Sequence, residues 1–308
     1  MSAEAAFIER LRGLATDSGA RGLLDDAAVL EVGGETLVLT HDMIVEGVHY
    51  LPGDPPADVA WKLIAVNLSD LAAKGALPIG ALLGFTLGDE AWDRAFAEGL
   101  GAALTAFGVP LLGGDTVSAS TRVLGLTAIG RAACAPPSRS GARAGDLLWV
   151  SGTIGDAGAG LRVLKGELGA ADALVERYRN PRPRIEGGQR LAPLVSAMMD
   201  VSDGLLLDAS RMAAASGCAV QIELDSVPLS DTYLALCGEA RLDAAGAGDD
   251  YELLFATDGS RAGAILALAE EIGLPFSRIG RFAAGEGLVL SDRGAPIPLP
   301  ARLGFEHG

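Results

Sequence analysis

The sequence predicts a mixed α/β fold of the α+β class, divided into two domains that each layer helices on a β-sheet. Short apolar runs that suit buried strands recur along the chain between longer segments with helical periodicity. The chain has 308 residues, and because a domain holds roughly 100 to 200 residues, this length favours two domains. The stretch CAPPS, residues 134–138, is the best boundary, which predicts domains of residues 1–136 and 137–308.

Two helices and four strands are predicted in the N-terminal half besides the central helix described below. Residues 1–15 have the pattern of an amphipathic helix, and residues 89–107 place apolar side chains on one face before Gly108, which can end the last turn. The sequence VPLLGGDTVSAS, residues 109–120, is expected to be a strand that runs into two glycines and an acid. Apolar runs predict three further strands: 37–39, 80–87 and 123–129.

The C-terminal half also alternates predicted strands and helices. The glycine-rich segment 151–160 lacks the Gly-Lys-Ser/Thr ending of a Walker A loop and fits the dinucleotide pattern poorly, so we interpret it as a strand-to-helix turn. The basic segment 178–184 has the composition of a solvated loop, and a helix that Gly217 ends is expected after a turn at Asp203. Three apolar runs predict strands: 147–150, the run that ends at Asp200, and 251–255.

The composition limits the class of protein and its partners. Hydrophobic residues make up 49% of the chain, which is typical of a soluble globular enzyme and excludes a largely disordered chain. The formal net charge is −16, from 24 basic and 40 acidic residues. We therefore expect neither nucleic acid nor a membrane as a partner, whereas an acidic protein can still bind phosphates if divalent cations supply positive charge.

The cysteines and the apolar runs indicate a cytoplasmic protein. The N-terminal segment carries Glu4 and Glu9 and has no continuous apolar core, so it has the pattern of neither a signal peptide nor an anchor. The longest uncharged run, 75–88, is shorter than the roughly 20 apolar residues of a membrane span. Three isolated cysteines without CxxC spacing favour a reducing compartment over zinc or disulfides: Cys134, Cys218 and Cys237.

The central segment 61–78 predicts an almost wholly apolar helix that nevertheless carries an acid. Asn67, Asp70 and Lys74 form one narrow polar stripe, and Gly75 can close the last turn. A carboxylate removed from water costs several kcal/mol unless it is paired, hydrogen-bonded or bound to a cation. Asp70 therefore forms an ion pair with Lys74 or binds a metal ion, and this stretch alone leaves both interpretations open.

Other polar residues also stand in or beside apolar segments. Gly113 and Gly114 let the backbone approach a ligand beside Asp115, which suits a metal-bound phosphate, although a glycine turn capped by aspartate fits equally. Arg139 can clamp a phosphate or lie on the surface, and His49 alone fits a structural histidine. Six acids occupy positions where solvated carboxylates are not expected: Asp26, Asp42, Asp70, Asp115, Asp200 and Asp203.

This set of acids predicts several divalent cations. Carboxylate oxygens suit magnesium or calcium, and the chain has too few histidines and cysteines for a zinc site. Several magnesium ions in one cleft are typical of phosphoryl transfer, in which catalysis consists mostly of positioning and charge neutralisation.

Seven motifs follow one another along the chain in this order: DDAA, THDMIVEGVHY, KLIAVNLSDLAAKGALP, GGDT, RSGARAGD, DVSDG and DDYELLF. With these motifs the chain resembles the thiamine-monophosphate kinase family, whose superfamily includes aminoimidazole-ribotide synthetase and uses ATP without a Walker A loop. The resemblance covers nearly the whole chain.

The resemblance implies direct transfer of the γ-phosphoryl group of ATP to thiamine monophosphate, with several Mg²⁺ ions as cofactors and no phosphoenzyme. It also implies a homodimer formed through the N-terminal domains. The implied Mg²⁺ ligands are Asp26, Thr40, Asp42, Asp70, Asp115, Asp200 and Asp203. The residues implied to bind ATP are Gly114, Asp115, Arg139 and Ser202, and those implied to bind the thiamine end are His49, Asp249 and Phe305.

The sequence departs from the family pattern at four places. Leu24 stands where the family usually has glycine, His41 replaces a common threonine, and Asp249 replaces the usual glutamate. Residues 117–120, VSAS, replace a segment that often has arginine and glycine. A purine-type synthetase on the same scaffold and a non-catalytic magnesium-nucleotide-binding regulator remain as alternative functions.

Overall fold

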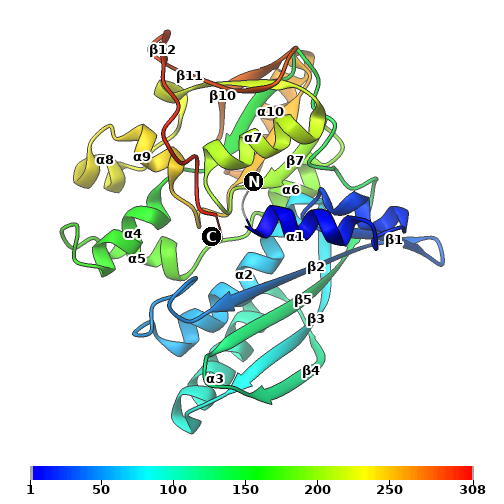
Figure 1. The fold of residues 1–308 in the computed structure, drawn as a ribbon, viewed down its shortest axis with the longest axis vertical. Helices are drawn as coiled ribbons and strands as arrows, with labels where there is room; N and C mark the ends of the chain where they lie inside the picture. Colours follow the sequence, from blue (N-terminus) through cyan, green and yellow to red (C-terminus); the bar gives the residue numbers. More distant parts are fainter. Residues whose placement is uncertain (1–2, 307–308) are drawn as a thin grey trace.

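Two β-sheets with helices packed on them make up the chain in the computed structural model, which describes residues 3–306 (Figure 1). The predicted mixed α/β class is confirmed. In Figure 1 the first sheet occupies the lower half of the molecule and the second sheet the upper half. Among the described residues, no helix is long and apolar enough to cross a membrane.

The first sheet has five strands in the order β1-β2-β5-β3-β4, and only the β3–β4 pair is parallel. The strands are β1 (Ala28–Val32), β2 (Glu35–Val45), β3 (Ala76–Leu87), β4 (Leu111–Ser118) and β5 (Val123–Ala132). The helical segments of this half are α1 (Ala3–Arg12), η1 (Ser18–Leu23), α2 (Pro56–Ala73) and α3 (Glu90–Phe107). Helices α2 and α3 cover one face of the sheet and enclose an apolar core with it (Figure 1).

The second sheet has seven strands in the order β12-β11-β8-β10-β6-β9-β7. The strands are β6 (Leu147–Ser151), β7 (Ala197–Asp200), β8 (Ala219–Glu223), β9 (Leu253–Thr257), β10 (Phe276–Ala283), β11 (Gly287–Asp292) and β12 (Ala295–Ile297). The α-helices are α4 (Asp156–Leu164), α5 (Asp172–Arg179), α6 (Ile185–Leu191), α7 (Leu205–Ser216), α8 (Asp231–Cys237), α9 (Arg241–Gly246) and α10 (Ala262–Ile272). Three-residue 3₁₀ turns are η2 (Leu224–Ser226) and η3 (Gly259–Arg261).

Capping explains why the predicted helix over 89–107 forms where it does. The Asp89 carboxylate accepts a hydrogen bond from the Trp92 N–H at 3.0 Å, and Gly108 adopts a left-handed conformation at the other end. The predicted amphipathic helix at the N-terminus is α1, and the first two residues of that prediction lie outside the described residues.

Several strands differ from their predicted bounds, and the differences at β2, β4 and β9 concern the candidate polar residues. Strand β2 extends from Glu35 to Val45, so its polar residues lie within the strand and not beyond its end. Strand β4 continues through both glycines. Strand β9 begins at Leu253 rather than at Tyr251, because Asp249 and Tyr251 both have positive φ, which is incompatible with an extended strand.

The segment between β5 and β6 joins the two sheets and contains the predicted boundary after residue 136, which stays a prediction. The Arg21 guanidinium donates hydrogen bonds to the carbonyl oxygens of Pro136 and Pro137, at 2.9 and 3.0 Å. This connecting segment is therefore held against the N-terminal half.

Helix α2 belongs to the cores of both halves. Its buried residues Leu63 and Leu68 pack in the core of the first sheet, whereas Ala72 and Ala73 pack against the second sheet. Helix α6 crosses it at close range, because a Cβ atom added to Gly188 would lie 1.9 Å from the Ala72 carbonyl oxygen. The two halves are therefore fixed to each other through α2.

We expect Gly188→Ala to destabilise the protein by about 2 kcal/mol, because the added methyl group would push α6 away from α2. Chemical denaturation monitored by circular dichroism measures this change. Gly101→Ala is the matched control: this glycine lies inside α3 with open space around its Cα, so alanine is expected to stabilise by about 0.5 kcal/mol. Equal stability of the two variants would contradict the close packing.

Candidate active site

Three buried or half-buried acids from both halves of the chain meet where α2 contacts the second sheet. Asp26 precedes β1, Asp70 lies on α2, and Asp200 ends β7. One carboxylate oxygen of each lies within 4.8 Å of one oxygen of each of the others. Such a group of hard oxygen atoms can hold a divalent cation.

Asp70 does not pair with Lys74, so the ion-pair interpretation of the central helix is wrong. The Asp70 carboxylate accepts a hydrogen bond from the Thr40 hydroxyl group on β2. The ammonium group of Lys74 instead pairs with Asp25 and, at 2.8 Å, with Asp26. The chain folds this way because the loop before β1 lies against the C-terminal end of α2, which brings the two acids to a fully buried lysine.

Burial and mutual repulsion raise the pKa values of most of these acids. Burial, reinforced by the charge of Asp26, raises the pKa of Asp200 to about 8, although the Ser69 hydroxyl donates to it at 2.5 Å. Burial and the neighbouring charge of Asp42 hold the pKa of Asp70 well above its usual range. Without a cation, this cluster therefore disfavours the charged forms of Asp70 and Asp200.

Asp26 and Asp42 differ in their partners. Burial alone would raise the pKa of Asp26, but the charges of Arg139 and Lys74 lower it well below its usual range. Arg139 is therefore not a free surface arginine, because it forms an ion pair with Asp26. Burial and the charge of Asp26 raise the pKa of Asp42 to about 6.

A cavity of about 590 Å³ lies beside this cluster. Its lining includes six residues that the sequence singled out: Asp42, His49, Ser202, Asp203, Asp249 and Phe305. The structure therefore brings residues predicted for the metal, for the nucleotide and for the substrate to one cavity.

The residues predicted for the substrate are held by their neighbours. The Val45 N–H donates to His49 Nδ1 at 3.1 Å, which leaves Nε2 as the protonated nitrogen of a neutral ring. Phe305 lies 46% exposed, and its N–H donates to the Asp203 carbonyl oxygen at 2.9 Å. This hydrogen bond ties the C-terminal segment to the wall of the cavity.

Asp203 has partners that the sequence analysis did not identify. Arg211 on α7 forms ion pairs with Asp203 and with Asp208, and the N–H groups of Ser202 and Asp203 each donate to Asp208 at 3.1 Å. Asp208 is fully buried within the apolar sequence LLLDAS. An acid inside an apolar helix is the same signal that drew attention to Asp70, so Asp208 could have been found in this way.

Gly114 and Asp115 lie apart from the cluster within the single chain. They occupy β4, the exposed edge strand of the first sheet. Asp42 lies on β2, and the paired strands β5 and β3 lie between Asp42 and Gly114. At a spacing of about 4.8 Å per strand, this separation is about 14 Å. The glycine-turn interpretation of this segment is wrong, because residues 111–118 form a strand.

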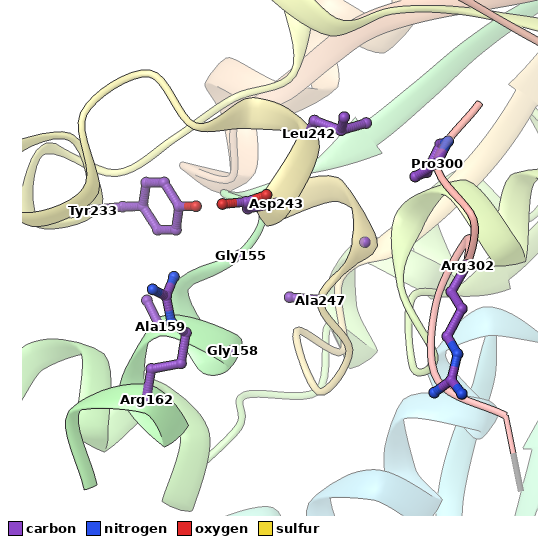
Figure 2. A pocket seen from close by; sticks show the side chains of 11 residues that line it. Gly155, Gly158, Ala159, Arg162, Tyr233, Leu242, Asp243, Ala247, Pro300 and Arg302 are labelled. Atoms are coloured by element: carbon purple, nitrogen blue, oxygen red, sulfur yellow. The ribbon is translucent and has the colours of Figure 1, made fainter. Parts of the chain in front are cut away.

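A second cavity, of about 430 Å³, adjoins the first and shares three small residues with it: Gly158, Gly246 and Ala247. Figure 2 shows Arg162 on α4 and Arg302 on the C-terminal segment at different sides of this cavity. Asp243 is the one acid in its lining. The second cavity therefore lacks the grouped carboxylates of the first.

Both halves of the chain match a family of known proteins. Residues 24–132 match the family of AIR synthase related proteins, N-terminal domain, and residues 143–293 match the C-terminal domain of that family. A thiamine-monophosphate kinase from Caulobacter vibrioides is 43% identical over 305 residues, which cover 95% of this chain and 86% of that protein. The chain belongs to the thiamine-monophosphate kinase family. Membership of this kinase family makes it an enzyme.

Solved structures of thiamine-monophosphate kinases have the same fold. The kinase from Stenotrophomonas maltophilia K279a is 39% identical, with a TM-score of 0.78 over 94% of this chain and 95% of that one. The complex of AaThiL with AMPPCP and TMP is 30% identical, with a TM-score of 0.85 over 98% of this chain and 96% of that one. The two-sheet architecture described above is therefore the architecture of the thiamine-monophosphate kinases.

We expect Asp70→Asn to have opposite effects on stability without and with Mg²⁺. Without the ion, the substitution removes a buried acid from the neighbourhood of other acids and should stabilise the protein by about 1 kcal/mol. With Mg²⁺, the same change removes a ligand, so the ion should raise the melting temperature less than it does in the wild type. Thermal unfolding in EDTA and in Mg²⁺ measures both effects.

Asp54→Asn is the control for this prediction. Asp54 is also buried, but it pairs with Arg179 at 2.8 Å, so its amide variant should be less stable in both conditions. If Asp70→Asn behaved like Asp54→Asn, Asp70 would be a structural hydrogen-bond acceptor and not part of a cation site.

Proposed function

We propose that this kinase transfers the γ-phosphoryl group of ATP directly to the phosphate of thiamine monophosphate and releases thiamine diphosphate and ADP. The observation that carries the proposal is the meeting of Asp26, Asp70 and Asp200 beside the cavity lined by His49 and Asp249. Two phosphate groups that must react repel each other, and grouped carboxylates can bring cations between them. The names of the relatives and the AMPPCP and TMP complex of AaThiL support the same two substrates.

The acids fit several Mg²⁺ ions, because they supply oxygen atoms and compensating negative charge in one place. When bound, Mg²⁺ would neutralise charge on the phosphates and hold them in line for transfer. The proposed ligands are Asp26, Thr40, Asp42, Asp70, Asp115, Asp200 and Asp203. The chain itself needs no nucleophile, since it acts by placing the donor and the acceptor.

Gly114, Arg139 and Ser202 are proposed to bind the ATP phosphates. Arg139 donates to Asp26 in this structure, so its guanidinium group already lies at the acidic cluster. A cation bound by Asp26 would weaken this ion pair, and a guanidinium group can then donate two hydrogen bonds to a phosphate. The Ser202 N–H donates to the Asp208 carboxylate at 3.1 Å, and Ser202 lines the cavity.

His49, Asp249 and Phe305 are proposed to bind the thiamine end. Thiamine monophosphate carries a cationic thiazolium ring and an aminopyrimidine with N–H donors. The half-exposed ring of Phe305 offers a face for stacking, and the Asp249 carboxylate offers acceptor oxygens. Asp249 is one methylene shorter than the glutamate usual in the family, so the substrate must lie closer to the backbone at this point.

The uncovered face of the first sheet is proposed as the dimer contact. Helices α2 and α3 cover the other face, and the edge strand β4 is exposed along its length. Large apolar residues that the register places on this face are exposed to solvent: Leu30, Val32, Met43, Leu77, Ile79, Leu82, Leu112 and Val117. Contact between two such faces would bury them, and Asp115 would then reach a cation site only by serving the partner subunit.

The activity is tested by incubating the purified protein with ATP, Mg²⁺ and thiamine monophosphate and separating the products by chromatography. We expect equal amounts of ADP and thiamine diphosphate. Formation of ADP without thiamine diphosphate would indicate another acceptor, such as that of a purine-type synthetase. Absence of turnover would indicate a nucleotide-binding regulator, and either result would reject the proposal.

We expect Asp203→Asn to lower kcat by at least about tenfold and to be partly rescued by raised Mg²⁺, because a ligand is lost where negative charge accumulates. Steady-state kinetics at several Mg²⁺ concentrations measures this. Asp243→Asn, in the neighbouring cavity, should leave kcat unchanged. An unchanged rate in Asp203→Asn would remove Asp203 from the site.

Val117→Asp should convert the dimer into monomers and lower activity by at least about tenfold, because a charge at the contact opposes burial. Light scattering after size-exclusion chromatography measures the mass. Val289→Asp is the control, since Val289 is equally exposed but lies on β11 in the other sheet. A Val117→Asp protein with unchanged mass would refute this contact.

A further inference from the structure

Lys62 on α2 is a buried lysine whose partners are residues of the substrate end of the cavity. Its side chain is 2% exposed. The ammonium group donates to the His49 carbonyl oxygen and to the Asp249 carboxylate, each at 2.9 Å. It also lies 3.9 Å from the centre of the Tyr178 ring.

These contacts join three segments that are far apart in the sequence. His49 follows β2, Tyr178 lies on α5, and Asp249 precedes β9. An ammonium group has three protons, and burial is costly unless these protons find acceptors. Lys62 meets this requirement with acceptors from both halves of the chain, two of which belong to residues that line the cavity.

The Asp249 carboxylate is held at both oxygen atoms. Lys62 donates to Oδ2, and the Tyr251 hydroxyl group donates to Oδ1 at 3.2 Å. The backbone at Asp249 has a left-handed conformation, with φ of 71°, and its N–H donates to the Ser202 carbonyl oxygen. The remaining lone pairs of the carboxylate therefore have a fixed direction.

We propose that Lys62 is a positioning residue for the acceptor substrate. Lys62 holds the Asp249 carboxylate and the backbone at His49 in the orientation that binds a cationic heteroaromatic group with N–H donors. The inference rests on the proposed function, because the thiamine end of the acceptor is such a group. Lys62 is itself positive and cannot attract a thiazolium ring. Its contribution is therefore the orientation of an acceptor and not the attraction of charge.

Helix α2 fixes the distance between Lys62 and Asp70. Lys62, Val66 and Asp70 follow each other at intervals of four residues, so they lie along one face of the helix, and Val66 also lines the cavity. At 1.5 Å per residue, Lys62 and Asp70 are about 12 Å apart along the axis. One rigid element thus sets the distance between the end that holds the substrate ring and the acids at the phosphates.

The test is Lys62→Met, which keeps the length of the side chain and removes its hydrogen bonds. We expect the KM for thiamine monophosphate to rise by at least about tenfold, while the KM for ATP changes by no more than about twofold. In an Asp249→Asn background, the same substitution should raise that KM much less, because the two residues act through one contact. Equal rises in both KM values, or additive effects in the double variant, would refute the inference.

Tyr251→Phe provides a second variant in case Lys62→Met does not fold. It removes the other hydrogen bond to the same carboxylate, so the KM for thiamine monophosphate should rise by about threefold or more with an unchanged melting temperature. An unchanged KM would overturn the inference, as would tighter binding of thiamine monophosphate by Lys62→Met. Wild-type protein that does not phosphorylate thiamine monophosphate would refute the proposed function instead, so the two failures are distinguishable.

Discussion

The burial of negative charge along α2 is the constraint on which the rest of the structure depends. Asp70 lies in an apolar helix and faces other acids, an arrangement that is unfavourable without compensating groups. The chain supplies these groups with Thr40 from β2, Arg139 from the segment after β5 and Lys74 from the end of α2 itself; the last two pair with Asp26. The loop before β1 and the segment after residue 136 are therefore held at α2 by electrostatics as well as by packing.

Two buried lysines lie at different positions along the polar face of α2 and have different roles. Lys74, at the C-terminal end of the helix, neutralises Asp25 and Asp26 beside the proposed cation site. Lys62, two turns before Asp70, binds Asp249 and the His49 carbonyl at the substrate end. Because both lysines are almost completely buried, their ion pairs are shielded from solvent and direct side chains more strictly than surface pairs do.

Local patterns in the sequence predicted most elements but not the contacts of their polar residues. The helix over 89–107 was predicted because its apolar face and its caps are local features. Lys74 was considered a partner for Asp70 because the two are four residues apart, yet it pairs with acids almost fifty positions away. The two glycines before Asp115 suggested a turn, whereas they lie in β4, where the absence of a Cβ lets the backbone of Gly114 approach Leu83.

The sequence by itself determined the fold class, the family resemblance and the fact that an acid on α2 needs a partner. Periodicity and capping act within a few residues, so they can be recognised without the fold. Only the tertiary structure decided that Asp26, Asp70 and Asp200 meet and that Gly114, next to Asp115, lies about 14 Å from Asp42 within one chain. The physical reason is that electrostatic energy depends on the distance between atoms, and this distance is set by how strands and helices pack.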